Sequence, residues 1–114
     1  MPYIRTRLSA PLTAEQELSL KSKLGKAVED LPGKTEKWLM AEFCDNCRLW
    51  FAGDNSSPAA MVEVALFGKA PAAAYGKMTA DLTAILAEEL GIAPDRVYVK
   101  YEETPYWGWN GSNF

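Results

Sequence analysis

Residues 31–43, LPGKTEKWLMAEF, share their pattern with residues 90–102, LGIAPDRVYVKYE, and the two stretches align without a gap. Each is typical of the end of a helix, a turn and a strand in that order. Pro11 and Pro71 stand at matching places before the two helices. The repeat predicts two pseudo-symmetric β-α-β units, each covering about half of the 114 residues and each right-handed.

Local signals outside these stretches complete the expected order of elements. Residues 13–16, TAEQ, have the form of a capping box, and Gly91 supplies a helix stop. Apolar residues fill 59–67 except at Glu63, which predicts a central strand buried on both faces. We expect helices at 14–31 and 71–90, and strands at 2–8, 38–44, 48–52, 59–67 and 96–102. The predicted fold class is α+β, a single domain over residues 1–114 whose four-stranded mixed sheet carries both helices on one face.

Composition narrows the functional classes. The chain has 12 Lys and Arg against 15 Asp and Glu, a net charge of −3, which argues against binding to a nucleic acid backbone. Its start lacks the apolar region of a signal peptide, and no stretch approaches the ~20 apolar residues that cross a bilayer. The sequence predicts a soluble cytoplasmic protein without a membrane partner.

Histidine is absent from the sequence. This excludes Ser-His-Asp and Cys-His catalysis, and it removes the usual proton carrier at neutral pH. Acid–base chemistry near pH 7 would need a carboxylate, Lys, Cys or Tyr of shifted pKa, or the α-amine of the chain, whose reference pKa is about 7.7 to 8.0. The α-amine needs the smallest shift.

The C-terminal residues 104–114 are rich in aromatic side chains, among them Tyr106, Trp107, Trp109 and Phe114. Four aromatic residues are too many for a frayed terminus, and the sheet face without helices also needs a cover. Both features predict a homo-oligomer that shares the tail and the open sheet faces between subunits. The alternative is a tail folded onto its own domain.

Five motifs now stand in order along the chain, namely Met1-Pro2, Gly33-Lys34, FGK at 67–69, PDRVYV at 94–99 and GWNGSNF at 108–114. With them the whole sequence resembles the macrophage migration inhibitory factor and D-dopachrome tautomerase family of the tautomerase superfamily. The resemblance implies a homotrimer with active sites at the subunit interfaces. It also implies a keto–enol tautomerase (isomerase) that acts on small aromatic 2-oxo acids or enols of the phenylpyruvate or dopachrome type. Neither a cofactor nor a metal is expected.

The resemblance gives the catalytic role to Pro2. Removal of Met1 would make its secondary amine the chain terminus, and burial beside a cation would lower the pKa of that amine. Lys34 would be the cation and would hold a substrate carboxylate or the enolate oxygen. The backbone N–H of Phe67 takes the position that donates to a substrate oxygen.

Further pocket residues follow from the same resemblance. Trp107 and Trp109 take or adjoin the aromatic positions, and Tyr98 would come from a neighbouring subunit. The chain departs from the mammalian pattern at Lys100, which replaces an Asn, and at Trp38, which replaces a Tyr. Both departures concern the pocket rim and therefore the substrate range.

Cys44 and Cys47 form a CxxC motif between two expected strands. Such a motif can be a redox pair, half of a zinc site, or two cysteines that flank a turn. Zinc is disfavoured without further Cys or any His, and a redox pair normally opens a helix. The sequence favours reduced, incidental thiols, with a thiol oxidoreductase as a weaker alternative.

A signalling or partner-binding role is the main rival to catalysis. Relatives of this type resemble secreted cytokines without a signal peptide, so export and a protein receptor stay open. The pocket would then be vestigial, and receptor binding would survive the loss of Pro2.

Overall fold

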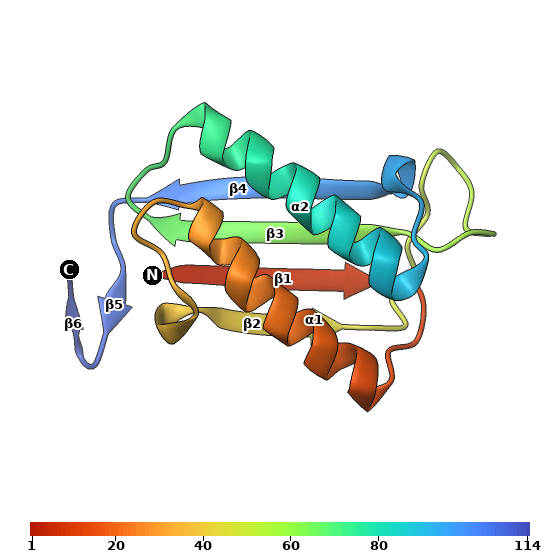
Figure 1. Cartoon of the computed structure of the whole chain (residues 1–114), viewed down its shortest axis with the longest axis horizontal. Coiled ribbons are helices and arrows are strands. Elements are labelled where there is room, and N and C mark those ends of the chain that lie inside the picture. The colour runs from red at the N-terminus through yellow and green to blue at the C-terminus, as the bar shows by residue number, and fades with distance from the viewer.

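The computed structural model describes all 114 residues and has two layers, a sheet and a pair of helices (Figure 1). The sheet follows the order β2-β1-β3-β4. Parallel pairing joins β1 to β2 and β3 to β4, whereas β1 and β3 are antiparallel. The expected mixed sheet of two β-α-β units is confirmed. Its strands are β1 (Pro2–Leu8), β2 (Met40–Cys44), β3 (Ala60–Phe67) and β4 (Val97–Thr104).

The helices begin and end at the predicted signals, apart from the last turn of the first. Helix α1 (Ala14–Ala27) starts at Thr13, whose side chain accepts from the Gln16 N–H in a full capping box, and its end tightens into the 3-10 turn η1 (Val28–Asp30). Helix α2 (Ala72–Leu90) ends at Gly91, where a φ of 66° needs a residue without a Cβ. Neither helix is long and apolar enough to cross a membrane.

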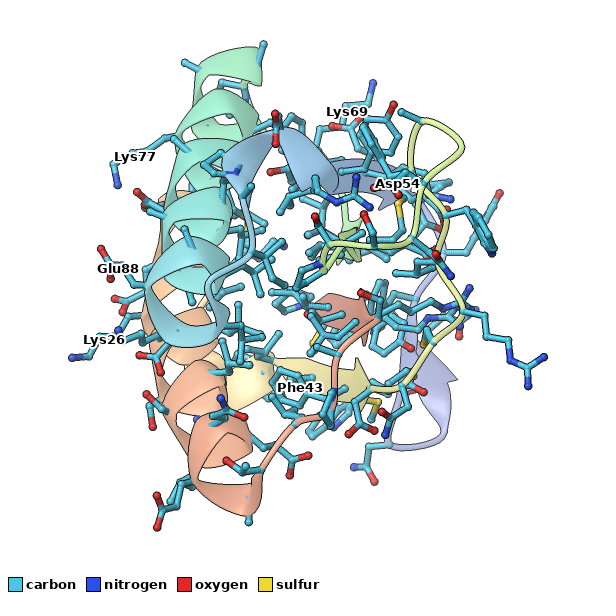
Figure 2. The ribbon with its side chains drawn as sticks, turned by 90° about the vertical axis from the view of Figure 1, so that its right-hand side faces the viewer. Lys26, Phe43, Asp54, Lys69, Lys77 and Glu88 are labelled. Atoms are coloured by element: carbon cyan, nitrogen blue, oxygen red, sulfur yellow. The ribbon has the colours of Figure 1, made fainter.

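The core lies between the sheet and the helices, and Figure 2 shows both helices on the same side of the strands. Alternate residues of β1 and β3 point into this layer because side chains alternate along a strand. The largest fully buried side chains are Ile4, Leu8, Leu20, Leu31, Leu66, Met78, Leu82 and Ile92. The charged side chains of Lys26, Lys77 and Glu88 point away from the sheet (Figure 2).

Three sequence expectations need correction. The strand expected at 48–52 does not form, because the chain offers that segment no partner beyond a bridge between Phe51 and Asp54. The strand expected from residue 38 starts at Met40, since a 3-10 turn, η2 (Glu36–Trp38), precedes it. Strand β3 is buried on one face only, because both helices cover the same side of the sheet.

The C-terminal segment folds into a hairpin beside the chain start. Strands β5 (Gly108–Trp109) and β6 (Ser112–Asn113) pair antiparallel, and Asn110 and Gly111 between them have φ values of 51° and 86°, as a two-residue hairpin turn requires. In Figure 1 this hairpin lies past the end of the sheet at which β1 begins. The segment that joins β2 to β3 lies past the opposite end.

Candidate active site

A cavity of about 840 Å³ opens at the start of β1, between the first residues, the η2 turn and the C-terminal hairpin. Four of the predicted site residues line it, namely Pro2, Trp38, Trp107 and Trp109. The lining also includes residues that were not predicted from the sequence, among them Tyr3, Lys37, Met40 and Glu42. Three of these residues lie on the paired strands, where Tyr3 of β1 stands opposite Met40 of β2, and Lys37 lies in the η2 turn.

The α-amine at the chain start has an altered acidity. Burial, followed by the positive charge of Lys34 and a hydrogen bond with it, lowers the pKa of the Met1 amine from 8.0 to about 6. All three effects disfavour the protonated amine. An amine at this place is therefore mostly a free base at pH 7.

The Lys34 ammonium lies against the end of β3. Lys34 follows Gly33, whose φ of 76° turns the chain. The Lys34 N–H donates to the Leu31 carbonyl at 3.0 Å. The Lys34 Nζ donates to the carbonyl oxygen of Phe67 at 2.9 Å. The predicted cation thus lies close to the amine and is hydrogen-bonded to the carbonyl of Phe67, the residue whose N–H is the predicted donor.

The backbone N–H of Phe67 donates to the carbonyl oxygen of Met1 at 3.1 Å. Pro2 is the first residue of β1 and pairs with Leu66 of β3. The bond from Phe67 to Met1 therefore extends the pairing of the two strands by one residue. Removal of Met1 would leave the N–H without its acceptor, next to the new Pro2 amine. The donor role expected for Phe67 therefore requires a chain without Met1.

Aromatic rings join the C-terminal hairpin to the cavity wall. Trp38 and Trp109 meet edge to face with ring centres 5.0 Å apart. Phe114 lies 5.5 Å from the Phe67 ring and stacks on Trp109 at 6.4 Å, and its N–H donates to the Trp107 carbonyl at 3.1 Å. In this chain the tail contacts its own domain, and its sharing between subunits stays a prediction.

Tyr98 lies away from the cavity of its own chain. It pairs with Met61, which is level with Arg7, so five residues of strand separate it from Pro2, roughly 16 Å. Its side chain is 62% exposed. A single chain therefore does not bring this predicted residue to the base.

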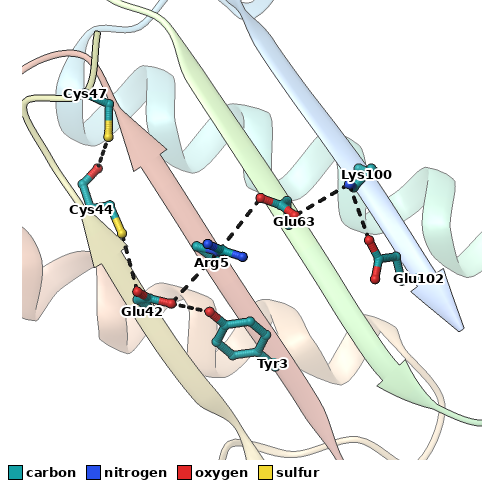
Figure 3. A network of polar contacts seen from close by, with 8 residues as sticks. All are labelled: Tyr3, Arg5, Glu42, Cys44, Cys47, Glu63, Lys100 and Glu102. Carbon is teal, nitrogen blue, oxygen red and sulfur yellow. Dashed lines mark hydrogen bonds and ion pairs between the residues drawn. The ribbon is translucent and has the colours of Figure 1, made fainter. Parts of the chain in front are cut away.

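Lys100 also lies outside the cavity, in a row of charged side chains across the open face of the sheet (Figure 3). Its Nζ lies 3.5 Å from Glu63 and 3.3 Å from Glu102. Arg5 continues the row, with its Nε 3.8 Å from Glu63 and 3.9 Å from Glu42. The sheet face without helices thus carries alternating charges, and carboxylates of the same chain pair with Lys100.

Glu42 joins this row to the cavity. It accepts a hydrogen bond from the Tyr3 hydroxyl, and this bond lowers the pKa of its carboxyl group. The Cys44 thiol also donates to Glu42, at 3.5 Å. The cavity therefore holds a carboxylate that already has partners.

The CxxC thiols are both free and make local contacts only. The Cys47 thiol donates to the Cys44 carbonyl at 3.2 Å. Burial, and then the neighbouring Glu42, raise the pKa of the Cys44 thiol, which disfavours the reactive thiolate. The geometry favours two thiols that flank a turn over a redox pair.

The twofold-repeated β-α-β fold, with an amine-bearing cavity at the start of its first strand, defines a class of small α+β proteins. A family model described as "Macrophage migration inhibitory factor (MIF)" matches residues 1–114. This chain belongs to the macrophage migration inhibitory factor family. The match agrees with the resemblance of its sequence to the tautomerase superfamily.

Individual relatives agree along the whole chain. The macrophage migration inhibitory factor of Meriones unguiculatus is 28% identical over 116 residues, covering 100% of this chain and 99% of the relative. The crystal structure of Leishmania major MIF2 is 33% identical with a TM-score of 0.92, covering 100% and 97%. A third similar structure is that of Pt0534 inactivated by 2-oxo-3-pentynoate, at 20% identity and a TM-score of 0.84, covering 96% and 93%; it supports the fold alone.

Proposed function

We propose that this protein is a keto–enol tautomerase whose base is the Pro2 amine exposed by removal of Met1. The observation that carries the proposal is the pKa of about 6 at the α-amine of the chain, caused by burial and by Lys34. In a chain without histidine, no other group of ordinary pKa is as well suited to exchange protons near pH 7. Pro2 is buried in the same cavity, so the same two causes would act on its amine.

The reaction needs only one proton carrier. The neutral Pro2 nitrogen removes a proton from the carbon next to the carbonyl, a C=C bond forms, and the electron pair of the C=O bond moves to oxygen. The Lys34 ammonium and the freed Phe67 N–H stabilise this oxyanion. The protonated amine then gives its proton to the oxygen, which completes an isomerisation without a co-reactant.

The cavity suits an aromatic 2-oxo acid. Lys34 can hold a carboxylate, and Lys37, whose Nζ lies 5.3 Å from the centre of the Trp38 ring, adds positive charge at the rim. The indole rings of Trp38 and Trp109 offer flat apolar surface to an aryl group. Phenylpyruvate is the substrate we would test first.

A homotrimer would complete the site. The segment 48–52 has strand-forming residues without a strand partner in its own chain, and Trp50 there is 66% exposed. The outer edges of β2 and β4 are also unpaired, and such edges invite a neighbouring chain. Tyr98 and Lys100 would then reach the cavity of an adjoining subunit.

The test is the replacement of Pro2 by Gly, with mass spectrometry to confirm loss of Met1. Tautomerisation of phenylpyruvate should fall by about 10²- to 10⁴-fold, the range for a lost acid–base group. Pro11→Ala, an exposed proline in the loop after β1, is the control and should keep full activity. Equal turnover by Pro2→Gly and the parent protein would refute the proposal.

A covalent reagent gives a second test of the same site. The 2-oxo alkyne that inactivated Pt0534 should add once to the chain through the Pro2 nitrogen, by attack of the free amine on the alkyne. Peptide mass mapping would identify the modified residue. Modification at a lysine or cysteine instead would argue against Pro2 as the reactive amine.

A further inference from the structure

The connection between β2 and β3 has a tight turn at residues 51–54. The Phe51 N–H donates to the Asp54 carbonyl at 2.9 Å, and the Asp54 N–H donates back at 3.0 Å. Ala52 and Gly53 both have positive φ, 53° and 75°, which is the geometry of a type I′ turn. The turn fixes the direction in which the Phe51 ring points.

Arg96 fastens this turn to the start of β4. Its guanidinium donates to three backbone carbonyls, those of Pro58 at 3.0 Å, Asp54 at 3.0 Å and Ser57 at 3.1 Å, and lies 3.5 Å from the Asp54 carboxylate. The side chain is only 13% exposed. A mostly buried cation with this many acceptors holds the loop in one place.

The Phe51 ring contacts both Arg96 and Tyr98. The guanidinium carbon is 5.6 Å from the centre of the Phe51 ring, within cation–π range. The Phe51 and Tyr98 rings meet edge to face with centres 5.0 Å apart and planes at 63°. Phe51 is therefore a fixed support for a tyrosine that is otherwise largely exposed.

We propose that Phe51, held by Arg96, is a positioning residue that orients Tyr98 for the aryl group of a substrate bound by an adjoining subunit. The inference rests on the proposed tautomerase function. Phe51 acts through Tyr98 and touches no reacting atom. Its loss should weaken binding of the aryl group and leave proton transfer at Pro2 unchanged.

The experiment compares Phe51→Leu, Tyr98→Ala and the double variant with the parent protein. Phe51→Leu should raise KM for phenylpyruvate about three- to tenfold, the size of one aromatic pair, with kcat unchanged. KM for an alkyl 2-oxo acid should stay the same. The double variant should equal Tyr98→Ala alone, because residues that act as a unit are not additive.

Two controls separate positioning from general damage. Phe51→Tyr keeps the ring and should restore the parent KM, and Asn55→Ala removes an exposed side chain of the same loop outside the segment 48–52. Light scattering and thermal unfolding check assembly and folding. An unchanged KM in Phe51→Leu, additive effects in the double variant, or loss of the oligomer in Phe51→Leu alone would each overturn the inference.

Failure of the proposed function itself gives a different result. In that case the parent protein is inactive, or Pro2→Gly retains its activity, whatever residue stands at 51. Fluorotyrosine labelling with ¹⁹F NMR reads the Tyr98 ring directly, with Tyr98→Phe to assign its signal. That signal should shift in Phe51→Leu and stay in place in Asn55→Ala, and an unmoved signal in Phe51→Leu would contradict the support role.

Discussion

The two β-α-β halves have the same plan and carry different chemistry. In each half a 3-10 turn leads from the helix into an edge strand, η2 (Glu36–Trp38) before β2 and η3 (Pro94–Arg96) before β4. In the gapless alignment of residues 31–43 with 90–102, Lys37 falls opposite Arg96. Each of these cations lies near an aromatic ring, Lys37 near Trp38 and Arg96 near Phe51.

The difference lies in what each turn faces. The first turn meets the chain start, the one place where an α-amine is available, and the preceding Lys34 lowers the pKa of that amine. The corresponding position of the second half is Ala93, and its turn instead holds the loop that contains Phe51. The two halves therefore share a backbone plan, and only the first places a lysine, Lys34, beside an α-amine.

Lys34→Gln should produce the largest change in this comparison. Loss of its charge removes the second cause of the lowered amine pKa and the stabilisation of the substrate oxyanion. We expect kcat/KM for phenylpyruvate to fall about 10²- to 10³-fold, in the range reported for a lost oxyanion partner. The acid limb of the pH–rate profile should also move to higher pH.

Lys26→Gln is the matched control, since Lys26 lies on the outer side of α1 (Figure 2). Its activity and pH profile should equal those of the parent protein. A Lys34→Gln profile whose acid limb does not move would show that Lys34 does not act on the amine.

Retention of Met1 should give a pH-dependent stability. The amine pKa is about 6 in the folded chain and 8.0 as its reference, so between these values the unfolded chain binds more protons. The free energy of unfolding should therefore rise from pH 6 to pH 8 and fall as the pH drops. The amine is largely solvated, so the change should be modest.

Urea unfolding at pH 6, 7 and 8 measures this effect. The protein is prepared with the methionine aminopeptidase of the expression host inhibited, so that Met1 is retained. The absence of histidine leaves this pH window with few other titrating groups. Burial raises the pKa of the Asp30 carboxyl group. The Asp30→Asn variant removes its contribution to the pH dependence. N-terminal acetylation should abolish the slope, and a slope that survives acetylation would assign it to another group.

Met1-retaining protein should also bind phenylpyruvate poorly, because the Met1 carbonyl already accepts the Phe67 N–H.

Sequence patterns predicted most of the fold because its signals are local. The capping box at Thr13, the stop at Gly91 and the alternation of β1 each depend on a few neighbouring residues. The 48–52 strand failed because a strand needs a partner, and hydrophobic pattern alone does not say whether the same chain supplies one. The charges on the open sheet face were individually visible in the sequence, but their row across four strands depends on register.

The candidate site was only partly predictable from the sequence. Pro2, Lys34, Phe67, Trp38, Trp107 and Trp109 come together around the chain start. Their roles remain predictions, and Tyr98 and Lys100 lie outside the cavity of their own chain. Glu42 and Tyr3 were missed because their place at the cavity follows only from the pairing of β1 with β2.

Ala52→Gly, in the turn held by Arg96 of the second half, should give the smallest effect. Ala52 has a φ of 53°, a left-handed conformation that costs an L-residue roughly 1 kcal/mol and glycine almost nothing. Glycine also gains freedom in the unfolded chain, which offsets part of this relief, so we expect a net stabilisation of about 0.5 kcal/mol. Urea unfolding measures it, and Ala84→Gly, within α2, should instead destabilise by about 1 kcal/mol. Because the turn only fixes Phe51, Ala52→Gly should leave KM for phenylpyruvate unchanged, whereas a raised KM would mean that the rigidity of the turn itself helps to position Tyr98.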